Sequence, residues 1–259
     1  MNMGRYLKLS VLKLTMIHRA LSQTSSSTNE CSTLAFPLIN HELVMQPSKS
    51  CKTIHFVRHA EGIHNRDSRE IPDFGKNLTR SMAYHDAPLT DVGVEQGRRL
   101  FEQVQNLTFA PEIVVVSPLR RTLHTAELGF RLNGAGPPFI ATELCRERIS
   151  YHTCDGRRNL TLIQKDFPFV DFSQVTDEVD AMWETKEDFP SDKASEACAR
   201  RALRFLHWLA ARPETVIAVV SHWVFFTHLF ALFPDKNLKI AFGNAEMRSV
   251  VLCLPNQSK

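Results

Sequence analysis

Between residues 53 and 254, short apolar segments alternate with longer segments in which apolar residues recur at helical spacing. The short segments are rich in β-branched residues, and they lack the polar alternation of a surface strand, which is typical of strands buried inside a sheet. They cover residues 53–57, 113–116, 139–142, 216–220 and 248–254. This alternation predicts an α/β fold, a three-layer sandwich in which a mainly parallel central sheet carries helices on both faces.

The helical segments between these strands begin at recognisable capping residues. They cover residues 90–106, 119–130 and 193–212. Thr90 is a good N-cap for the first helix, and Ser117 followed by Pro118 predicts the start of the second. Residues 150–192 show little periodicity, so we expect a long excursion with one short helix near residues 177–183.

Cations and imidazoles follow three of the predicted strands. Arg58 and His59 come directly after the first strand. An arginine pair at residues 120–121 follows the second strand, and His222 follows the late strand at 216–220. The carboxyl ends of parallel strands meet at one edge of a sheet, where open α/β proteins bind their ligands. We therefore expect these side chains to form one pocket for a compact dianion, of which phosphate is the obvious example.

The composition is that of an ordinary soluble globular protein. Apolar residues make up 43% and the net charge is only +3, so we expect a local basic pocket and no nucleic-acid partner. Six cysteines without a C-x-x-C pair are not a disulfide framework, so we expect reduced thiols in an intracellular compartment. A bridge between Cys145 and Cys154 is the weaker alternative.

The first fifty residues differ from the rest of the chain, and we expect residues 1–50 to form a flexible extension. Residues 1–29 are basic, rich in serine and free of acidic residues, which is the pattern of an organellar transit peptide. A disordered extension without any targeting function is equally consistent with this composition. Lys8 and Lys13 interrupt every apolar run, so a membrane span is not expected. The predicted location is cytoplasmic, or mitochondrial or plastid if residues 1–29 are a transit peptide.

Three spaced motifs connect the candidate residues. R-H-A-x-x-x-x-N lies at residues 58–65, L-T-x-x-G-x-x-Q at 89–96, and S-x-L-x-R-T-x-x-T-A at 117–126. The third motif selects Arg121 over Arg120, and Glu147 and His222 complete the set. With these residues, the sequence resembles the histidine phosphatase superfamily, the phosphoglycerate mutase-like proteins, over residues 53 to about 253. It is most similar to the plant phosphoglycerate mutase-like group.

The resemblance implies that residues 51–259 form a catalytic domain with the phosphoglycerate mutase-like fold. It implies metal-independent phosphoryl transfer through a phosphohistidine on His59, with Glu147 as the general acid. The phosphoryl group would be held by Arg58, Asn65, Arg121 and His222. No cofactor and no metal ion are implied, and the partner would be a small phosphorylated metabolite, with no nucleic acid or membrane.

The expected reaction is hydrolysis of a small phosphomonoester, such as a sugar phosphate, by a histidine-type acid phosphatase. The chain lacks the R-x-Y-G run that follows the acid in the glycolytic mutases, which favours hydrolysis, but a phosphoglycerate mutase stays an alternative. The third hypothesis is a catalytically weak phosphate-binding or regulatory protein. It is motivated by the bulky Trp223 and Val224, which follow His222 where the family usually has small residues.

Several candidates also have a purely structural interpretation. Glu147 lies between two arginines and could form a surface ion pair, while Glu143 offers a second carboxylate nearby. The remaining histidines, His64 among them, are expected to be structural or solvated. Arginines lower the pKa of Glu147, whereas burial and bound phosphate raise it, so we expect a raised pKa only with substrate bound. Arg157 and Arg158 are candidates for substrate contact on charge alone.

Overall fold

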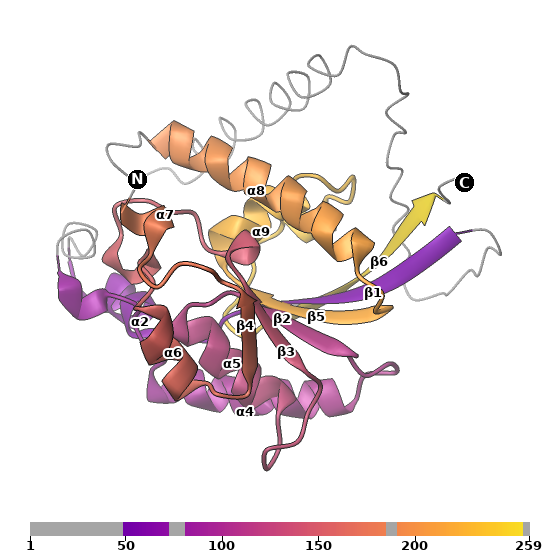
Figure 1. Ribbon diagram of the computed structural model, residues 1–259, viewed down its shortest axis with the longest axis horizontal. Helices are drawn as coiled ribbons and strands as arrows, with labels where there is room; N and C mark the ends of the chain where they lie inside the picture. Colours follow the sequence, from indigo (N-terminus) through magenta and orange to yellow (C-terminus); the bar gives the residue numbers. More distant parts are fainter. Residues whose placement is uncertain (1–48, 73–80, 185–190, 256–259) are drawn as a thin grey trace.

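A six-stranded sheet forms the middle layer of the computed structural model, which describes residues 49–72, 81–184 and 191–255 (Figure 1). The strands are β1 (Lys49–Arg58), β2 (Ile113–Val116), β3 (Phe139–Thr142), β4 (Val170–Gln174), β5 (Val216–Ser221) and β6 (Met247–Pro255). Their order across the sheet is β4-β3-β2-β5-β1-β6, and only β6 runs antiparallel to its neighbour. The predicted mainly parallel sheet is confirmed.

Helices cover both faces of the sheet, as the strand–helix alternation predicts (Figure 1). They are α2 (Ile63–Glu70), α4 (Asp91–Gln105), α5 (Arg120–Phe130), α6 (Leu160–Asp166), α7 (Ala181–Glu184), α8 (Ser191–Ala211) and α9 (Trp223–Phe230). Short 3₁₀ helices are η1 (Met82–Tyr84), η2 (Glu143–Cys145), η3 (Thr153–Asp155) and η4 (Asn237–Lys239). Helices α8 and α9 pack on one face, and α4 and α5 pack on the other.

Alternate residues of each central strand enter opposite layers of the core. In β5, Ile217 and Val219 join the cluster under α8 and α9, whereas Ala218 and Val220 join the cluster under α4 and α5. Because both faces of β5 are covered, its residues form an unbroken apolar run rather than an alternating one. The two packed faces fix the register of the strands, and thereby the positions of the residues that follow their carboxyl ends.

The structure corrects the predicted start of α5. Its N-cap is Leu119, not Ser117, and no side chain of the cap residue bonds to the helix. The first free amide of the helix, at Arg120, instead donates to the carboxylate of Asp86, 2.7 Å away. The side chain of Asp86, 34 residues earlier in the chain, therefore caps the helix. The Ser117 hydroxyl does not cap it and bonds elsewhere.

The excursion over residues 150–192 contains more regular structure than its weak periodicity predicts. Helix α6 and the edge strand β4 both lie within it, and α7 lies near the expected short helix. Strand β4 reads Val-Asp-Phe-Ser-Gln, with two buried residues and three exposed ones. An edge strand has one covered face and one exposed face, so its sequence alternates between apolar and polar residues. It therefore lacks the unbroken apolar run by which a buried strand is predicted.

The prediction of reduced thiols is wrong for one pair, since Cys51 and Cys253 form a disulfide. The two residues lie directly opposite each other on β1 and β6, the strands nearest the two ends of the described chain. Their separation of 202 residues hides this neighbourhood in the sequence. Cys145, Cys154 and Cys198 are free and buried, so the alternative bridge between Cys145 and Cys154 is also wrong. Burial raises the pKa of the Cys198 thiol to about 12.

The expected extension over residues 1–50 falls almost wholly outside the described residues, which begin at residue 49. The transit-peptide interpretation of residues 1–29 therefore stays a prediction. Residues 49 and 50 already belong to β1, so the first strand begins two residues before the expected domain boundary. Within the described part of the chain, no helix combines the length and the apolar character that crossing a membrane requires.

Candidate active site

Two of the predicted strand-end clusters meet where β1 and β5 end side by side. Arg58, the last residue of β1, is in register with Ser221, the last residue of β5. The residue that follows each strand is a histidine, and the ring centroids of His59 and His222 are 5.2 Å apart. Both imidazoles are buried. The sheet register alone therefore brings together two residues that are 163 positions apart in the chain.

The hydrogen bonding of His59 defines which ring nitrogen is available for chemistry. Its Nδ1 lies 2.7 Å from the carbonyl oxygen of Ala60, which can only accept, so Nδ1 carries the proton. In the neutral ring Nε2 then holds the lone pair. Burial, and then the positive charges of Arg121 and Arg58, hold the pKa of His59 well below its usual value. The ring is therefore neutral at physiological pH, the form in which it can act as a nucleophile.

Two arginines flank this imidazole, each fixed by its own backbone contact. Arg58 donates from Nη1 to the carbonyl of Phe242, at 2.6 Å. Arg121 is almost fully buried, and it donates to the carbonyl of Cys154 and to the carboxylate of Asp155. The Nε atoms of both arginines are buried without a hydrogen-bond partner in the described residues. Each guanidinium thus keeps a donor that only a further acceptor would satisfy.

His222 and His64 complete the polar lining around His59. Ser117 Oγ lies 2.8 Å from Nε2 of His222. The Ser117 hydroxyl therefore bonds to this imidazole and does not cap α5. The ring centroid of His64, on α2, lies 5.8 Å from that of His59. Burial and the arginine charges hold the pKa of both rings well below the usual value. The Nδ1 atoms of His64 and His222 are also buried without a partner in the described residues.

Sequence reasoning missed His64, which we had expected to be structural or solvated. It belongs to the first turn of the short helix α2, directly after the His59 loop, and is 8% exposed. Four buried nitrogens on the two guanidiniums and two imidazoles near His59 have no hydrogen-bond partner among the described residues. They are Arg58 Nε, Arg121 Nε, His64 Nδ1 and His222 Nδ1. Such a set, next to two permanent positive charges, suits an oxyanion that accepts several hydrogen bonds at once.

The side chain of Glu147 is buried against the first turn of α9 and does not form a surface ion pair. Its Oε1 accepts from the amides of Arg148 (2.8 Å) and Phe225 (2.9 Å), and its Oε2 accepts from that of Val224 (3.3 Å). Burial, and next the negative charge of Asp155, raise the pKa of this carboxyl, and the nearby arginines offset only part of that. The expectation of a raised pKa only with substrate bound is therefore wrong, because burial already dominates without it.

The other carboxylate of this segment, Glu143, forms ion pairs with two buried arginines. It accepts from Arg146 at 2.7 Å and from Arg157 at 2.8 Å. Arg157 is thus held inside the protein, and Arg158 pairs with Asp86 and Asp166. Both arginines of the 157–158 pair are thus paired with carboxylates of the protein, and a substrate contact by either stays a prediction.

The structure gives defined contacts to Asn65 and to the bulky residues after His222. The side-chain oxygen Oδ1 of Asn65 accepts from the backbone amide of Gly62 at 3.0 Å and closes the first turn of α2. Its role in phosphate binding stays a prediction. Trp223 packs against the core cluster under α8 and α9, and the backbone amide of Val224 faces Glu147. The expected narrowing of the pocket by these two side chains stays a prediction.

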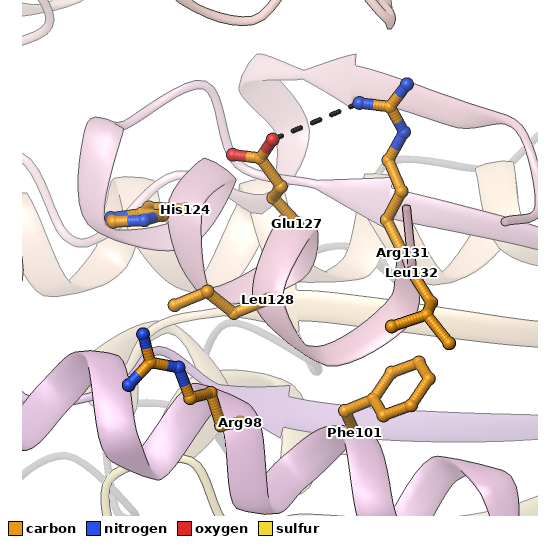
Figure 2. A pocket seen from close by; sticks show the side chains of 7 residues that line it. All are labelled: Arg98, Phe101, His124, Glu127, Leu128, Arg131 and Leu132. Carbon is orange, nitrogen blue, oxygen red and sulfur yellow. Dashed lines mark ion pairs between the residues drawn. The ribbon is translucent and has the colours of Figure 1, made fainter. Parts of the chain in front are cut away.

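A separate hollow of about 430 Å³ lies between α4 and α5, on the outer side of the molecule (Figure 2). Phe101 and Leu128 line it together with His124, and an ion pair of Glu127 and Arg131 spans 3.9 Å at its edge. No residue of the His59 cluster lines it. The hollow and the cluster at the strand ends are therefore distinct places in the fold.

Comparison with known proteins agrees with this architecture. The family model of the histidine phosphatase superfamily (branch 1) matches residues 54–252. The chain is 35% identical over 249 residues to the phosphoglycerate mutase-like protein of Arabidopsis thaliana, covering 82% of this chain and 89% of that protein. It is 37% identical over 245 residues to phosphoglycerate mutase-like protein 1 of the same species, covering 80% and 83%.

The same fold occurs in the crystal structure of a phosphoglycerate mutase from Bacillus anthracis. That structure matches with a TM-score of 0.51 and 18% identity, covering 82% of this chain and 94% of the other. The fold and the sequence relatives define an enzyme of the phosphatase and mutase class, which acts by phosphoryl transfer. The chain belongs to the histidine phosphatase superfamily (branch 1).

Proposed function

We propose that this protein is a phosphomonoesterase that hydrolyses a small phosphorylated metabolite through a phosphohistidine on His59. The observation that supports it most is the neutral, buried imidazole of His59, whose Nδ1 is committed to the Ala60 carbonyl. Its Nε2 is left with a lone pair beside the guanidiniums of Arg58 and Arg121. A neutral nucleophile next to fixed positive charge is what attack on a phosphate dianion requires.

The reaction proceeds in two displacements. Nε2 of His59 attacks phosphorus, the P–O bond to the ester oxygen breaks, and Glu147 gives its proton to the departing alcohol. Water then attacks the phosphohistidine, Glu147 takes a proton from it, and inorganic phosphate leaves with the imidazole restored. Arg58, Arg121 and His222 hold the oxygens of the transferring group, where negative charge spreads in the transition state.

The burial of Glu147 supports its role as the acid. A carboxyl group must keep its proton near neutral pH to give it to a leaving alcohol, and burial favours the protonated form. The three amides at its oxygens would by themselves favour the carboxylate. The raised pKa of Glu147 shows that burial and the charge of Asp155 outweigh them.

The test is an assay with a set of phosphomonoesters, with and without EDTA and vanadate, run on wild type, His59→Ala and His124→Ala. We expect hydrolysis that survives chelation, is inhibited by vanadate and is abolished only in His59→Ala. His124 is a matched control because it is a partly buried histidine on α5 that lines the separate hollow. Full activity in His59→Ala would overturn the proposal.

The same assay separates the two alternative functions. Conversion of 3-phosphoglycerate to 2-phosphoglycerate that depends on a bisphosphate primer, without net phosphate release, would indicate a mutase. Binding of phosphate or vanadate without turnover of any ester would indicate a regulatory phosphate-binding protein.

A further inference from the structure

Asp155 contacts one of the two arginines that we assign to phosphate binding. Its Oδ1 lies 3.1 Å from Nη2 of Arg121, and the carbonyl of the preceding Cys154 accepts from Nη1 of the same guanidinium. The side chains of Arg121 and Asp155 are only 1% and 6% exposed. A carboxylate at this place weakens the attraction of the arginine for an anion, so it does not simply add to phosphate binding.

The same carboxylate also acts on Glu147. After burial, the negative charge of Asp155 is the largest influence that raises the pKa of Glu147. Positive groups lie near Glu147 on several elements. They are Arg58 at the end of β1, Arg121 on α5, Arg148 next to Glu147 itself, and Arg201 on α8, whose Nη2 donates to the backbone carbonyl of Glu147 at 2.6 Å. The thiols of Cys154 and Cys198 are also near, and burial raises the pKa of each, so both stay neutral. Asp155 thus supplies the strongest negative charge that acts on Glu147.

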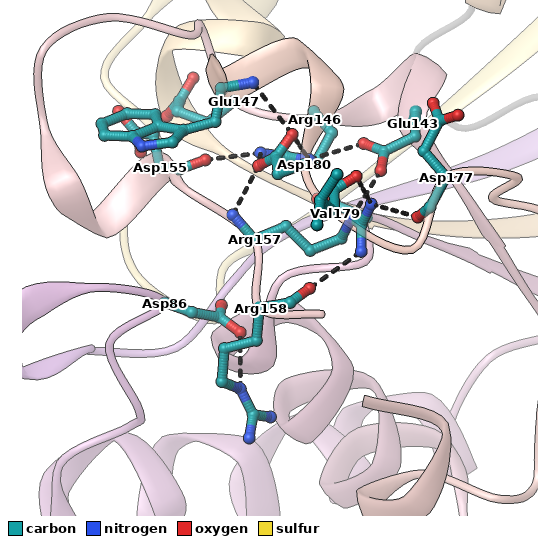
Figure 3. Close-up of polar contacts among 12 residues, drawn as sticks. Asp86, Glu143, Arg146, Glu147, Asp155, Arg157, Arg158, Asp177, Val179 and Asp180 are labelled. Carbon is teal, nitrogen blue, oxygen red and sulfur yellow. Dashed lines mark hydrogen bonds and ion pairs between the residues drawn. The ribbon is translucent and has the colours of Figure 1, made fainter. Parts of the chain in front are cut away.

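A buried ion network holds Asp155 in this position (Figure 3). Nη2 of Arg146, which is fully buried, donates to the backbone carbonyl of Asp155 at 2.6 Å and to Asp180 at 2.7 Å. The backbone amide of Arg157 also donates to Asp180, at 2.6 Å. Burying so many charges costs desolvation energy, so the network is better explained by the precise geometry it imposes on residues 154–157 than by stability.

We propose that Asp155 is a positioning residue of the phosphoryl-transfer site, which orients the Arg121 guanidinium and places a fixed negative charge beside the Glu147 carboxyl. This inference rests on the proposed function. The Asp155 carboxylate has two effects on the reaction. It lowers the affinity of the Arg121 guanidinium for the phosphate product, and it favours the protonated form of Glu147. The excursion after β3, which supplies Asp155, therefore takes part in the chemistry.

Asp155→Asn tests the proposal because it keeps an oxygen acceptor for Arg121 and removes only the charge. Asp86→Asn is the matched control, since Asp86 is a buried aspartate that pairs with Arg158 at 3.1 Å and accepts from the amide of Arg120. Asparagine keeps an oxygen for that amide, and among the described residues the Asp86 carboxylate bonds to neither the Arg121 side chain nor Glu147. The Glu147 carboxyl is titrated by ¹³C NMR, with its signal assigned from Glu147→Gln. Binding of inorganic phosphate is measured by calorimetry on the same proteins.

We expect the Glu147 titration midpoint to fall by about one pH unit in Asp155→Asn and to stay unchanged in Asp86→Asn. Phosphate is expected to bind roughly threefold or more tightly to Asp155→Asn, because the charge of Arg121 is no longer offset. Asp155→Ala is the second variant. It should show the same fall in midpoint, with weaker phosphate binding than Asp155→Asn, since Arg121 loses its side-chain acceptor.

An unchanged Glu147 midpoint in both Asp155 variants, or an equal shift in Asp86→Asn, would overturn the proposal. Weaker phosphate binding in Asp155→Asn than in wild type would overturn it as well, since an ordinary structural ion pair predicts that loss. Neither measurement needs turnover. A wild-type protein that hydrolyses no phosphomonoester would therefore overturn the proposed function while these readouts still decide the role of Asp155.

Discussion

Replacing Glu147 with glutamine removes the proposed acid while leaving most of its surroundings in place. The amides of Arg148 and Phe225 both point to Oε1, at 2.8 and 2.9 Å, and a glutamine oxygen can accept from both. Only the longer contact of Oε2 with the amide of Val224, at 3.3 Å, is lost. The change should cost about 1 kcal/mol of unfolding free energy. In contrast, loss of a general acid slows its reaction by about 10²- to 10⁴-fold.

The assay compares two leaving groups on the same variant. A simple alkyl phosphate releases a basic alcohol that needs a proton, whereas 4-nitrophenyl phosphate releases a stable anion. We expect Glu147→Gln to lose about 10² to 10⁴ in kcat/KM with the alkyl ester and far less with the aryl ester. Glu127→Gln is the control, because burial also raises the pKa of this carboxyl but it lies at the separate hollow.

The pH profile gives the same prediction with a definite sign. An acid catalyst works while it is protonated, so hydrolysis of the alkyl ester should fall as pH rises through the raised pKa of Glu147. That limb should disappear in Glu147→Gln. Equal losses with both leaving groups, or a wild-type rate that keeps rising to pH 9, would refute the assignment.

Three further substitutions test other parts of the structure. Ser117→Ala removes the hydroxyl 2.8 Å from His222 Nε2, and we expect kcat/KM for phosphomonoester hydrolysis to fall by about tenfold with an unchanged fold by circular dichroism. The double change Cys51→Ser and Cys253→Ser should lower the urea unfolding free energy by about 2–4 kcal/mol without altering kcat. Gly93→Ala would place a Cβ atom 2.1 Å from a backbone carbonyl oxygen, so thermal unfolding should show a loss of about 3 kcal/mol or more. A wild-type melting temperature in Gly93→Ala would contradict this packing.

The buried strands were predictable because local composition decides them. The predicted strands at 113–116 and 139–142 match β2 and β3 residue for residue, since parallel strands covered on both faces are short and mostly apolar. The edge strand β4 and the helix α9 were not predicted. Strand β4 is exposed on one side and lacks the unbroken apolar run of a buried strand, and α9 is apolar around most of its surface and lacks the one-sided apolar face of an amphipathic helix.

Within the site, residues that follow a strand were predictable and residues held by tertiary contacts were not. His59 and His222 follow directly from the parallel register of β1 and β5. His64 and Asp155 enter from short helices whose sequences resemble ordinary surface segments. The family resemblance selects Glu147, but the local sequence leaves Glu143 open, because the choice depends on which carboxylate meets the start of α9, 78 residues away. The disulfide between β1 and β6 was missed for the same reason.

The most direct test of the account is to identify the phosphorylated atom after a rapid quench of the enzyme with a phosphomonoester. Because Nδ1 of His59 is bonded to the Ala60 carbonyl, the account predicts one phosphoryl group per protein on Nε2 of His59, seen by peptide mapping and ³¹P NMR under alkaline conditions. The phosphoenzyme should disappear when the substrate is exhausted. Phosphate on Nδ1, on another residue, or on none during steady turnover would contradict the account.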